Sequence, residues 1–524
     1  MTPLPPLACS VGNETPQTIL PVSDTPVESV LRPPRQFPAL LKRLGRSLSS
    51  FQAVLLALLF ARVYWSCKDN IADPDIWWHL RNAQYLLGHL RFPNVDAYSF
   101  TAAGSPWINH EWLSEIFYYG AFSTLGLTGI FLVFTTAVAV LMGIVFSLSL
   151  NKSGDPLVAA IATAFGALLA MVGFTPRSQN FGWLCFVGIY AILLRFRSAK
   201  NGPLWLIPVL FCIWINCHGS WLLGLAIYAI VVGAGLVPRD IGRLAAARWS
   251  SLELRKLVLT GVTSVAALLI NPFGYRLLLY PFDMAFRQKL NVGNVDEWAS
   301  VDFNDLRGKV VATVLAAIFV MALTGRRRWR IDDALLTIFT LYCGVTHIRF
   351  LLLAGIVLPP ILAPQLGRIS SHHPERERRS LNSALLAIIV GICILNFPSA
   401  QMLDSQISRS FPTRAVQYLR AHPQRGNMFN QYEWGGYLEW TLPHIPTFID
   451  SRTDIFEYRG VLKDYLRVAT LGNSQEILNR YRISYVVYPV NTGLSYFLSK
   501  SPQWERLYSD GQAAIYRRKG TEGP

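Results

Sequence analysis

The chain has 524 residues, of which 52% are hydrophobic and only 15% are charged, and its formal net charge is +16. Soluble proteins usually carry about 25% charged residues, so this composition, with a mean hydropathy of +0.31, argues against an ordinary soluble protein. The basic residues cluster in short loops between apolar segments, which is typical of membrane topology rather than of nucleic-acid binding. The sequence therefore predicts a polytopic helical membrane protein that binds no nucleic acid.

The N-terminal segment differs in composition from the rest of the chain. Residues 1–38 are rich in Pro, Ser and Thr and poor in large apolar residues, so we expect a disordered tail. Together with the basic residues that follow, this tail makes up a predicted cytoplasmic segment of residues 1–50. No short apolar stretch is followed by a small-residue cleavage site, so the first apolar segment is expected to remain as a membrane anchor.

A predicted membrane domain occupies residues 51–398. It contains about eleven apolar segments of roughly 15–22 residues, the length that crosses the hydrocarbon core. Basic residues before the first segment place the N-terminus in the cytoplasm, and counting segments then places four later basic clusters on the same side. The same count places the loops 68–127 and 272–309 outside. The segments are 51–67, 128–149, 156–174, 181–196, 203–217, 219–237, 257–271, 310–324, 333–347, 348–366 and 382–398.

Residues 399–524 are predicted to form a soluble α/β domain outside the membrane. Residues 413–421 resemble a short helix. Residues 447–450, 485–488 and 513–516 resemble strands, because β-branched and aromatic residues dominate the first two of them. This region has no cysteine, and the cysteines elsewhere lack paired metal-ligand spacing, so we expect neither disulfides here nor redox chemistry.

The most informative segment comes directly after the first apolar segment. It contains the carboxylates of Asp73 and Asp75, followed by Trp77, Trp78 and His79. Carboxylates at a membrane surface can bind a divalent cation, bind a polar substrate or accept a proton. The alternative for the Asp-Pro-Asp triplet is a turn closed by an aspartate side chain.

Other polar residues also lie at the predicted outer ends of the apolar segments. Ionisable residues at membrane depth are costly and tend to mark substrate paths, so their collection on one side predicts one site. Arginine side chains suit bidentate contact with phosphate, and histidines could donate hydrogen bonds to the same group. Individually, these residues could instead anchor helices at the lipid headgroups. They are His110, Glu111, Arg177, His218, Glu297, His347 and Arg349.

These features resemble the GT-C membrane glycosyltransferases, which use polyprenyl-phosphate or polyprenyl-pyrophosphate sugars. Asp75-Ile-Trp-Trp-His-Leu-Arg81 resembles a string in the catalytic subunit of oligosaccharyltransferases that supplies a metal ligand and an acceptor-activating carboxylate. Tyr432–Tyr437 is more loosely similar to the family motif that helps recognise the acceptor peptide. The loop around Glu297 resembles one that carries a family glutamate. The chain departs from the family at Thr175–Gln179, where a second acidic pair is replaced.

The resemblance implies a bacterial inner-membrane glycosyltransferase with a cytoplasmic N-terminus. It would transfer a sugar from an undecaprenyl-linked donor, outside the membrane, to a protein, lipid or glycan acceptor. Asp75 is the predicted ligand for a possible Mn²⁺ or Mg²⁺ ion. The predicted catalytic residues are Asp75, Asp73, Glu111 and Glu297; the donor-phosphate ligands are Arg349, Arg177, His218 and His347; the acceptor or sugar contacts are His79, Trp77, Trp78, His110, Glu433 and Trp434.

Two other functions use the same residues without glycosyl transfer. A transporter or flippase of a lipid-linked substrate would use the arginines and histidines as a path, although the sequence lacks the internal repeats typical of transporters. A catalytically silent scaffold of GT-C type would bind a partner or glycan through the outer domain. Tolerance of Asp75→Asn would favour the scaffold over the enzyme.

Overall fold

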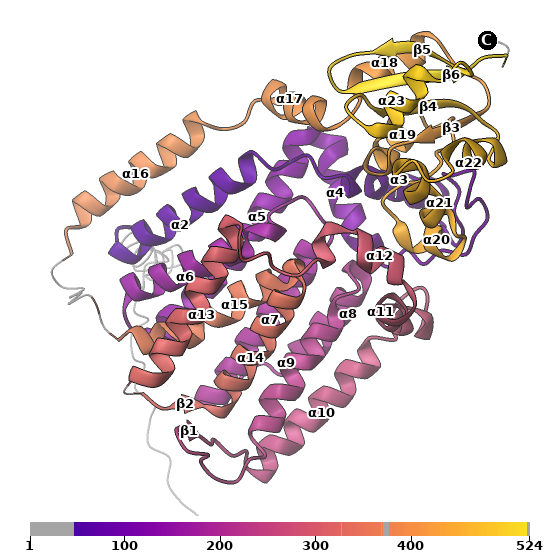
Figure 1. The fold of residues 1–524 in the computed structure, drawn as a ribbon. Coiled ribbons are helices and arrows are strands. Elements are labelled where there is room, and N and C mark those ends of the chain that lie inside the picture. The colour runs from indigo at the N-terminus through magenta and orange to yellow at the C-terminus, as the bar shows by residue number, and fades with distance from the viewer. Residues whose placement is uncertain (1–46, 326, 368, 370–376, 521–524) are drawn as a thin grey trace, which may run out of the picture. The chain divides into compact units, whose positions relative to one another are not determined.

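The computed structural model describes residues 47–325, 327–367, 369 and 377–520 (Figure 1). The described residues from Ser49 onward form one compact unit. The tail predicted for residues 1–38 lies outside the described residues, and the domain boundary predicted at residue 398 stays a prediction.

A helix lies at each of the eleven apolar segments that the sequence predicts. Six of these segments are long and apolar enough to cross a membrane: Phe51–Lys68, Leu127–Ser153, Pro156–Gly173, Gln179–Ala199, Leu306–Thr324 and Ile348–Leu366. The helices are α2 (Phe51–Lys68), α5 (Leu127–Ser153), α6 (Pro156–Ala170), α7 (Gln179–Ala199), α8 (Leu206–Cys217), α9 (Trp221–Ala234), α10 (Ser251–Ala267), α13 (Leu306–Thr324), α14 (Ile331–Thr346), α15 (Leu351–Leu362) and α16 (Arg379–Leu395), with short 3-10 turns η1 (Met171–Gly173), η3 (Ile348–Phe350) and η4 (Ala363–Leu366).

The pair α16 and α17 (Ala400–Ser410) would add a seventh candidate span, although the two helices are bent by 59°. Helices α8 and α9 are apolar but short; the 12 residues of α8 extend only about 18 Å at 1.5 Å per residue. The described residues thus form a polytopic helical protein with six to seven candidate spans, and the predicted total of eleven stays a prediction.

Helix α15 lies at the centre of the helical part. Each residue from Leu351 to Ile361 is buried. The helix packs closely against α6 at Gly166 and Gly355: a Cβ atom added to Gly355 would lie 2.4 Å from the Gly166 carbonyl oxygen. Only glycine permits two backbones to approach this closely. This contact fixes the position of α15, whose N-terminal side leads to the site described below.

The two predicted outer loops contain helices. The first loop holds α3 (Asp75–His89) and α4 (Trp112–Leu125). The second loop holds α11 (Tyr275–Arg287), α12 (Lys289–Asn294) and the 3-10 turn η2 (Asp296–Trp298).

The C-terminal region contains a four-stranded mixed sheet with helices. The strand order is β3-β4-β6-β5; β3 and β4 are parallel and the other two pairs are antiparallel. The elements of this region are α18 (Thr413–Ala421), β3 (Asn427–Asn430), η6 (Tyr432–Trp434), α19 (Gly435–Thr441), α20 (Thr453–Tyr458), α21 (Val461–Ala469), α22 (Ser474–Arg480), β4 (Ile483–Pro489), α23 (Gly493–Lys500), β5 (Trp504–Ser509) and β6 (Ala513–Arg518). Earlier in the chain, β1 (Leu244–Ala245) and β2 (Trp329–Arg330) form a separate parallel pair.

Three of the four local predictions in this region are confirmed, namely the helix at 413–421 and the strands at 485–488 and 513–516. The strand predicted at 447–450 is wrong, since this segment makes only one isolated bridge, from Thr447 to Ser99. The side chain of Asn430 takes the place of a neighbouring strand. It accepts a hydrogen bond from the Phe448 amide (2.8 Å) and donates one to the Ile449 carbonyl oxygen (2.7 Å).

The loop 68–127, predicted to lie outside, and the C-terminal region share one hydrophobic core. Trp78 and Trp107 from the loop lie in the same buried cluster as Phe429 and Phe448. Figure 1 shows α3 beside the C-terminal helices and strands. The segment that begins at Asp75 is therefore held between the helical part and the C-terminal region.

Candidate functional site

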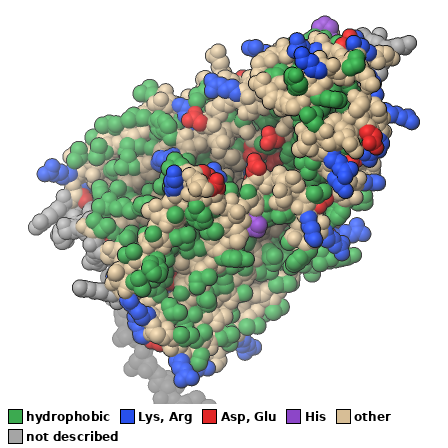
Figure 2. All heavy atoms as spheres, in the orientation of Figure 1, with side chains coloured by type: hydrophobic (Ala, Val, Ile, Leu, Met, Phe, Trp, Pro, Cys, Tyr) green, Lys and Arg blue, Asp and Glu red, His purple; other side chains and the backbone are tan. Residues whose placement is uncertain are grey.

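A polar cavity of about 450 Å³ lies where α3, the start of α7, the turn η2 and the C-terminal region meet. Figure 2 shows Asp and Glu side chains gathered in a hollow beside the C-terminal elements, whereas hydrophobic side chains cover much of the visible helical surface. Helix α7 begins at the cavity with Gln179 and ends at Ala199. Near that far end, Arg197 pairs with Asp332 at 3.2 Å. The cavity and the basic residue Arg197 thus lie at opposite ends of α7, which is about 30 Å long.

Ten of the fourteen predicted site residues line this cavity. They come from distant parts of the sequence, and the fold brings them together. They are Asp75, Trp78, His79, His110, Glu111, Arg177, His218, Glu297, Arg349 and Glu433.

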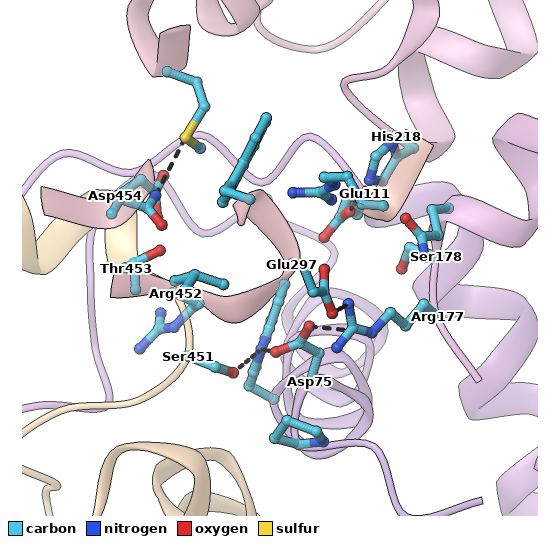
Figure 3. Close-up of a pocket in the computed structure, with 18 of the residues that line it drawn as sticks. Asp75, Glu111, Arg177, Ser178, His218, Glu297, Ser451, Arg452, Thr453 and Asp454 are labelled. Atoms are coloured by element: carbon cyan, nitrogen blue, oxygen red, sulfur yellow. Dashed lines mark hydrogen bonds and ion pairs between the residues drawn. The ribbon is translucent and has the colours of Figure 1, made fainter. Parts of the chain in front are cut away.

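Arg177 lies at the centre of the carboxylates. Its Nε donates to Asp73 Oδ2 at 2.6 Å and lies 3.8 Å from Asp75 Oδ2, and its Nη1 donates to Glu297. Figure 3 shows the guanidinium between Asp75 and Glu297. The hydroxyl group of the buried Tyr118 donates to the Arg177 carbonyl oxygen at 3.2 Å, which anchors the backbone of this loop.

The Asp-Pro-Asp triplet forms the turn that leads into α3 and also contributes to the site. The carboxylate of Asp73 accepts a hydrogen bond from the Asp75 amide at 3.0 Å, so the local turn and the ion pair with Arg177 coexist. Burial raises the pKa of Asp73 to about 6, although Arg177 acts in the opposite direction. Asp75 points into the cavity, and its Oδ1 lies 3.4 Å from Trp78 Nε1, which also donates to Ser451 Oγ at 3.0 Å.

Glu111 is surrounded by three histidines. Its carboxylate oxygens lie 3.6 Å from His79 Nε2, 3.7 Å from His110 Nε2 and 3.5 Å from His218 Nε2. Burial raises the pKa of Glu111 to about 8, with a further contribution from the nearby carboxylate of Glu115. This group can therefore hold a proton near neutral pH, which suits an exchange of protons with substrate or with His79.

The protonation of two of these histidines follows from their surroundings. His218 Nδ1 accepts a hydrogen bond from the Ser220 amide at 3.1 Å, so a neutral ring carries its proton on Nε2. Burial lowers the pKa of His218 well below its usual value. Burial also lowers the pKa of His110 to about 4, and the ring of His110 lies 4.3 Å from that of Tyr280. Both rings are therefore neutral at pH 7.

His79 is held by a buried carboxylate that the sequence did not single out. Glu115 is fully buried and contacts His79 Nδ1 at 3.0 Å, Asn82 Nδ2 at 3.1 Å and Asn109 Nδ2 at 2.7 Å. Burial lowers the pKa of His79, but the hydrogen bond to Glu115 and the charge of Glu111 outweigh it, so the net pKa is raised. His79 therefore links the inner carboxylate of Glu115 to Glu111 in the cavity.

Arg349 differs from Arg177 in its contacts. Its guanidinium lies 4.5 Å from the centre of the Trp298 ring, and it forms no ion pair with a carboxylate among the residues that the structure describes. Trp298 is held in turn by its carbonyl oxygen, 2.7 Å from His347 Nδ1. Arg349 thus presents to the cavity a cation that has no carboxylate within ion-pair distance in the described chain, although Glu297, Glu111 and Asp75 lie near enough to interact with its charge.

The other four predicted residues do not line the cavity. Asp73 lies behind Arg177, and His347 lies behind Trp298. Trp77 is buried against Phe411 and Tyr437, with ring centres at 5.7 and 5.0 Å. Trp434 is also buried, and its Nε1 donates to a backbone carbonyl oxygen at 3.0 Å. Trp77 thus packs α3 against the C-terminal region, whereas Trp434 is hydrogen-bonded to Ser410, and neither side chain lines the cavity.

The cavity also contains residues that the sequence analysis missed. Figure 3 shows Ser451, Arg452, Thr453 and Asp454 on the side opposite Ser178. Burial raises the pKa of Asp454 to about 7, and the Tyr280 hydroxyl group donates to it at 3.4 Å. The aromatic and acidic string around residue 450 was visible in the sequence, but its approach to α11 was not. Further residues that were not predicted as site residues include Gln179, Tyr280, Met284, Asn291 and Asn294, with Glu115 behind the cavity.

Asp75, the residue predicted to hold a divalent cation, lies beside other carboxylates, but their oxygens face a guanidinium. Mg²⁺ and Mn²⁺ require carboxylate oxygens directed at a common point. Here the oxygens of Asp73 and Glu297 point at the guanidinium of Arg177, with Asp75 close by. No group of three or more His, Cys, Asp or Glu residues in the described part of the chain has a metal-binding arrangement.

The fold is shared with solved membrane proteins. No protein-family model matches the sequence, and no curated protein matches it. Archaeoglobus fulgidus oligosaccharyltransferase tethered to an acceptor peptide is 12% identical, with a TM-score of 0.52 over 85% of this chain and 70% of that one. AglB from the same organism, solved with an inhibitory peptide and dolichol-phosphate, is 11% identical, with a TM-score of 0.52 over 91% and 75%.

ArnT from Cupriavidus metallidurans, solved with undecaprenyl phosphate, is 12% identical, with a TM-score of 0.50 over 90% of this chain and 99% of that one. AglB and ArnT are both GT-C membrane glycosyltransferases. The chain has the GT-C fold. The resemblance that the sequence predicted is thereby confirmed for the fold.

Proposed function

We propose that this protein is an integral membrane glycosyltransferase that transfers a sugar from a polyprenyl-phosphate or polyprenyl-pyrophosphate donor to an acceptor. The observation that carries this proposal is the cavity, where cations, neutral histidines and carboxylates converge at one end of the apolar helices. The GT-C fold supports it, since AglB and ArnT were solved with a polyprenyl-type phosphate.

The donor phosphate binds on the side of the cavity next to the helices. Arg349 is the main ligand, because its guanidinium has no carboxylate partner in the described chain and is held over Trp298. His218 donates a hydrogen bond from Nε2, and neither contact requires a change of protonation. The apolar surface beside this end of the helices accommodates the polyprenyl chain.

The acceptor binds on the side of the C-terminal region. Glu433 and Tyr432 line that part of the cavity, together with Ser451 and the residues up to Asp454. Burial raises the pKa of Glu433, whose carboxyl group can accept hydrogen bonds from an acceptor in this part of the cavity. The polar lining suits a hydroxylated or amide-containing acceptor.

The transfer is a displacement at the anomeric carbon of the sugar. A bond forms between the acceptor oxygen or nitrogen and this carbon, while the bond from the carbon to the phosphate oxygen breaks and its electron pair leaves with the phosphate. The acceptor proton passes to the carboxylate of Asp75, with Glu111 as a second proton-accepting group in its ionised form. Arg349 neutralises the charge that develops on the departing phosphate.

The proposed topology has eleven spans, with the N-terminus in the cytoplasm and the cavity outside. Its support is the separation of the cavity from the basic loops by the length of α7, since Lys and Arg are enriched on the cytoplasmic side. The loops at that far end include Lys200, which pairs with Glu253 at 3.2 Å. We place the protein in a bacterial inner membrane, where undecaprenyl-linked donors are available.

The test measures binding and turnover of polyprenyl-phosphate sugars by the purified full-length protein. We expect Asp75→Asn to abolish turnover while donor binding persists, and Arg349→Ala to weaken donor binding by about tenfold or more, as one charge-assisted contact contributes roughly 1.5–3 kcal/mol. Arg287→Ala is the matched control, because Arg287 is 77% exposed on α11 and does not line the cavity.

Binding without turnover over a broad set of acceptors would instead support a transporter or a silent scaffold. Absence of donor binding to the wild-type protein would reject the proposal.

A further inference from the structure

The cationic centre of the carboxylate cluster is an amino-acid side chain. Arg177 contacts Asp73 and Glu297 directly, and Asp75 Oδ2 lies 3.8 Å from its Nε. These carboxylates come from the start of α3 and from the turn η2, which are more than 200 residues apart in the sequence. The guanidinium therefore joins these two segments at one point.

The Arg177 side chain is held in this position from several directions. The Tyr118 hydroxyl group donates a hydrogen bond to the Arg177 carbonyl oxygen. The Arg177 side chain is only 18% exposed. The next residues, Ser178 and Gln179, begin α7 and line the cavity. The arginine is thus part of the rigid frame of the site rather than a mobile surface group.

A metal ion and this guanidinium would compete for the same oxygens. The Asp73 and Glu297 oxygens that face Arg177 already serve as acceptors of its N–H groups. A divalent cation bound to them would lie within a few ångströms of a permanent positive charge in a partly buried site, where repulsion is weakly screened.

We infer that Arg177 is the built-in cation of this site: it takes the place of a divalent metal ion among Asp73, Asp75 and Glu297, so that the protein works without a metal cofactor. Arg177 is a positioning residue in this scheme. It fixes the direction of the Asp75 carboxylate, while the unpaired Arg349 faces the phosphate. The inference deepens the proposed function and rests on it for the part that concerns transfer.

The first experiment measures metal binding without any donor. Full-length protein in detergent is titrated with Mn²⁺ and followed by electron paramagnetic resonance, for wild type, Arg177→Ala, the double variant Arg177→Ala/Asp75→Asn, and Arg287→Ala. We expect no stoichiometric Mn²⁺ binding to the wild type or to Arg287→Ala. Removal of the guanidinium in Arg177→Ala should create one Mn²⁺ site, and the added Asp75→Asn should remove it.

A wild-type protein that binds one equivalent of Mn²⁺, and loses it on Asp75→Asn, would overturn the inference. So would a folded Arg177→Ala variant that takes up no Mn²⁺, because the carboxylates would then not form a latent metal site. If Arg177→Ala does not fold, the wild-type titration and its Asp75→Asn control still decide the question.

The second experiment separates this inference from the proposed function. Transfer from a polyprenyl-phosphate sugar is measured with and without EDTA, and we expect the wild-type rate to stay unchanged. A rate that EDTA abolishes and Mn²⁺ restores would overturn the inference while supporting the glycosyltransferase. If no donor is turned over, the proposed function fails, and the Mn²⁺ titration alone still tests the role of Arg177.

Discussion

Glu115 is the buried carboxylate on which the position of His79 depends, and replacing it tests the inner part of the site. The substitution Glu115→Gln keeps the size of the side chain but removes the charge and one acceptor oxygen. Its contacts are His79 Nδ1, Asn82 Nδ2 and Asn109 Nδ2 at 2.7–3.1 Å, and its side chain is 0% exposed. The new amide NH₂ group would face at least one of these groups in place of an acceptor.

The expected cost follows from the number and type of these contacts. A hydrogen bond to a charged group contributes about 1.5–3 kcal/mol, and a buried donor left without a partner costs a similar amount. Asn82 can turn its amide group, because its Oδ1 has no partner, and this offsets part of the loss. We therefore expect Glu115→Gln to lower the free energy of unfolding by about 2–3 kcal/mol.

Denaturant unfolding of the purified protein in detergent, near neutral pH, measures this change. Glu111→Gln is the matched control, since Glu111 lies four residues earlier on the same segment and burial raises its pKa to about 8. A neutral amide there resembles the protonated acid, so this control should not be destabilised. Equal midpoints for wild type and Glu115→Gln would refute the assignment of Glu115 as a carboxylate that holds His79.

Three further predictions concern pH, helix packing and one tryptophan. Burial raises the pKa of Glu111 from 4.5 to about 8. Between these pH values the folded protein keeps a proton that the unfolded chain releases. The free energy of unfolding should therefore fall as the pH rises from 4.5 to about 8, by up to about 1.4 kcal/mol per pH unit. Thermal unfolding at a series of pH values should show a smaller slope for Glu111→Gln, and an unchanged slope would contradict the assignment. Gly355→Ala should destabilise the protein by about 1–3 kcal/mol, because its Cβ would meet a carbonyl oxygen of α6 at 2.4 Å. Gly391→Ala is the control and should not destabilise it, because the space around Gly391 is open. Equal unfolding midpoints for the two variants would refute the close approach of the two helices. Trp434→Phe should cost about 1 kcal/mol in unfolding through its lost hydrogen bond and leave donor and acceptor binding unchanged, and a binding defect without loss of stability would restore its predicted ligand role.

Much of the site could be predicted because its members are chemically out of place in an apolar chain. Asp75, Arg177, His218 and Arg349 each follow or begin an apolar segment, and each lines one cavity in the structure. Ionisable residues at membrane depth are costly and tend to mark substrate paths, so their position beside apolar segments identified these residues. The helices themselves were predicted for the same reason, since long apolar segments in a membrane protein have few alternatives.

The rest depends on contacts that no local pattern encodes. Glu115 looks like any acidic residue of an outer loop until Asn82 and Asn109 are placed around it. Residues 447–450 have the composition of a strand, yet the side chain of Asn430 binds their backbone groups instead. Trp77 was expected to contact a ligand because it neighbours Asp75, but the helical turn of α3 directs it into the core.

The two arginines of the cavity show why residue type alone did not fix their roles. Both were expected to bind donor phosphate, and both line the cavity, but Arg177 is neutralised by carboxylates whereas Arg349 lies over an aromatic ring. The ion pairs with Asp73 and Glu297 offset the positive charge of the Arg177 guanidinium, so it attracts an anionic ligand weakly. The guanidinium of Arg349 has no such ion pair in the described chain and attracts an anionic ligand more strongly. The partners that the fold places around each arginine thus determine whether it stabilises the site or is available to bind a ligand.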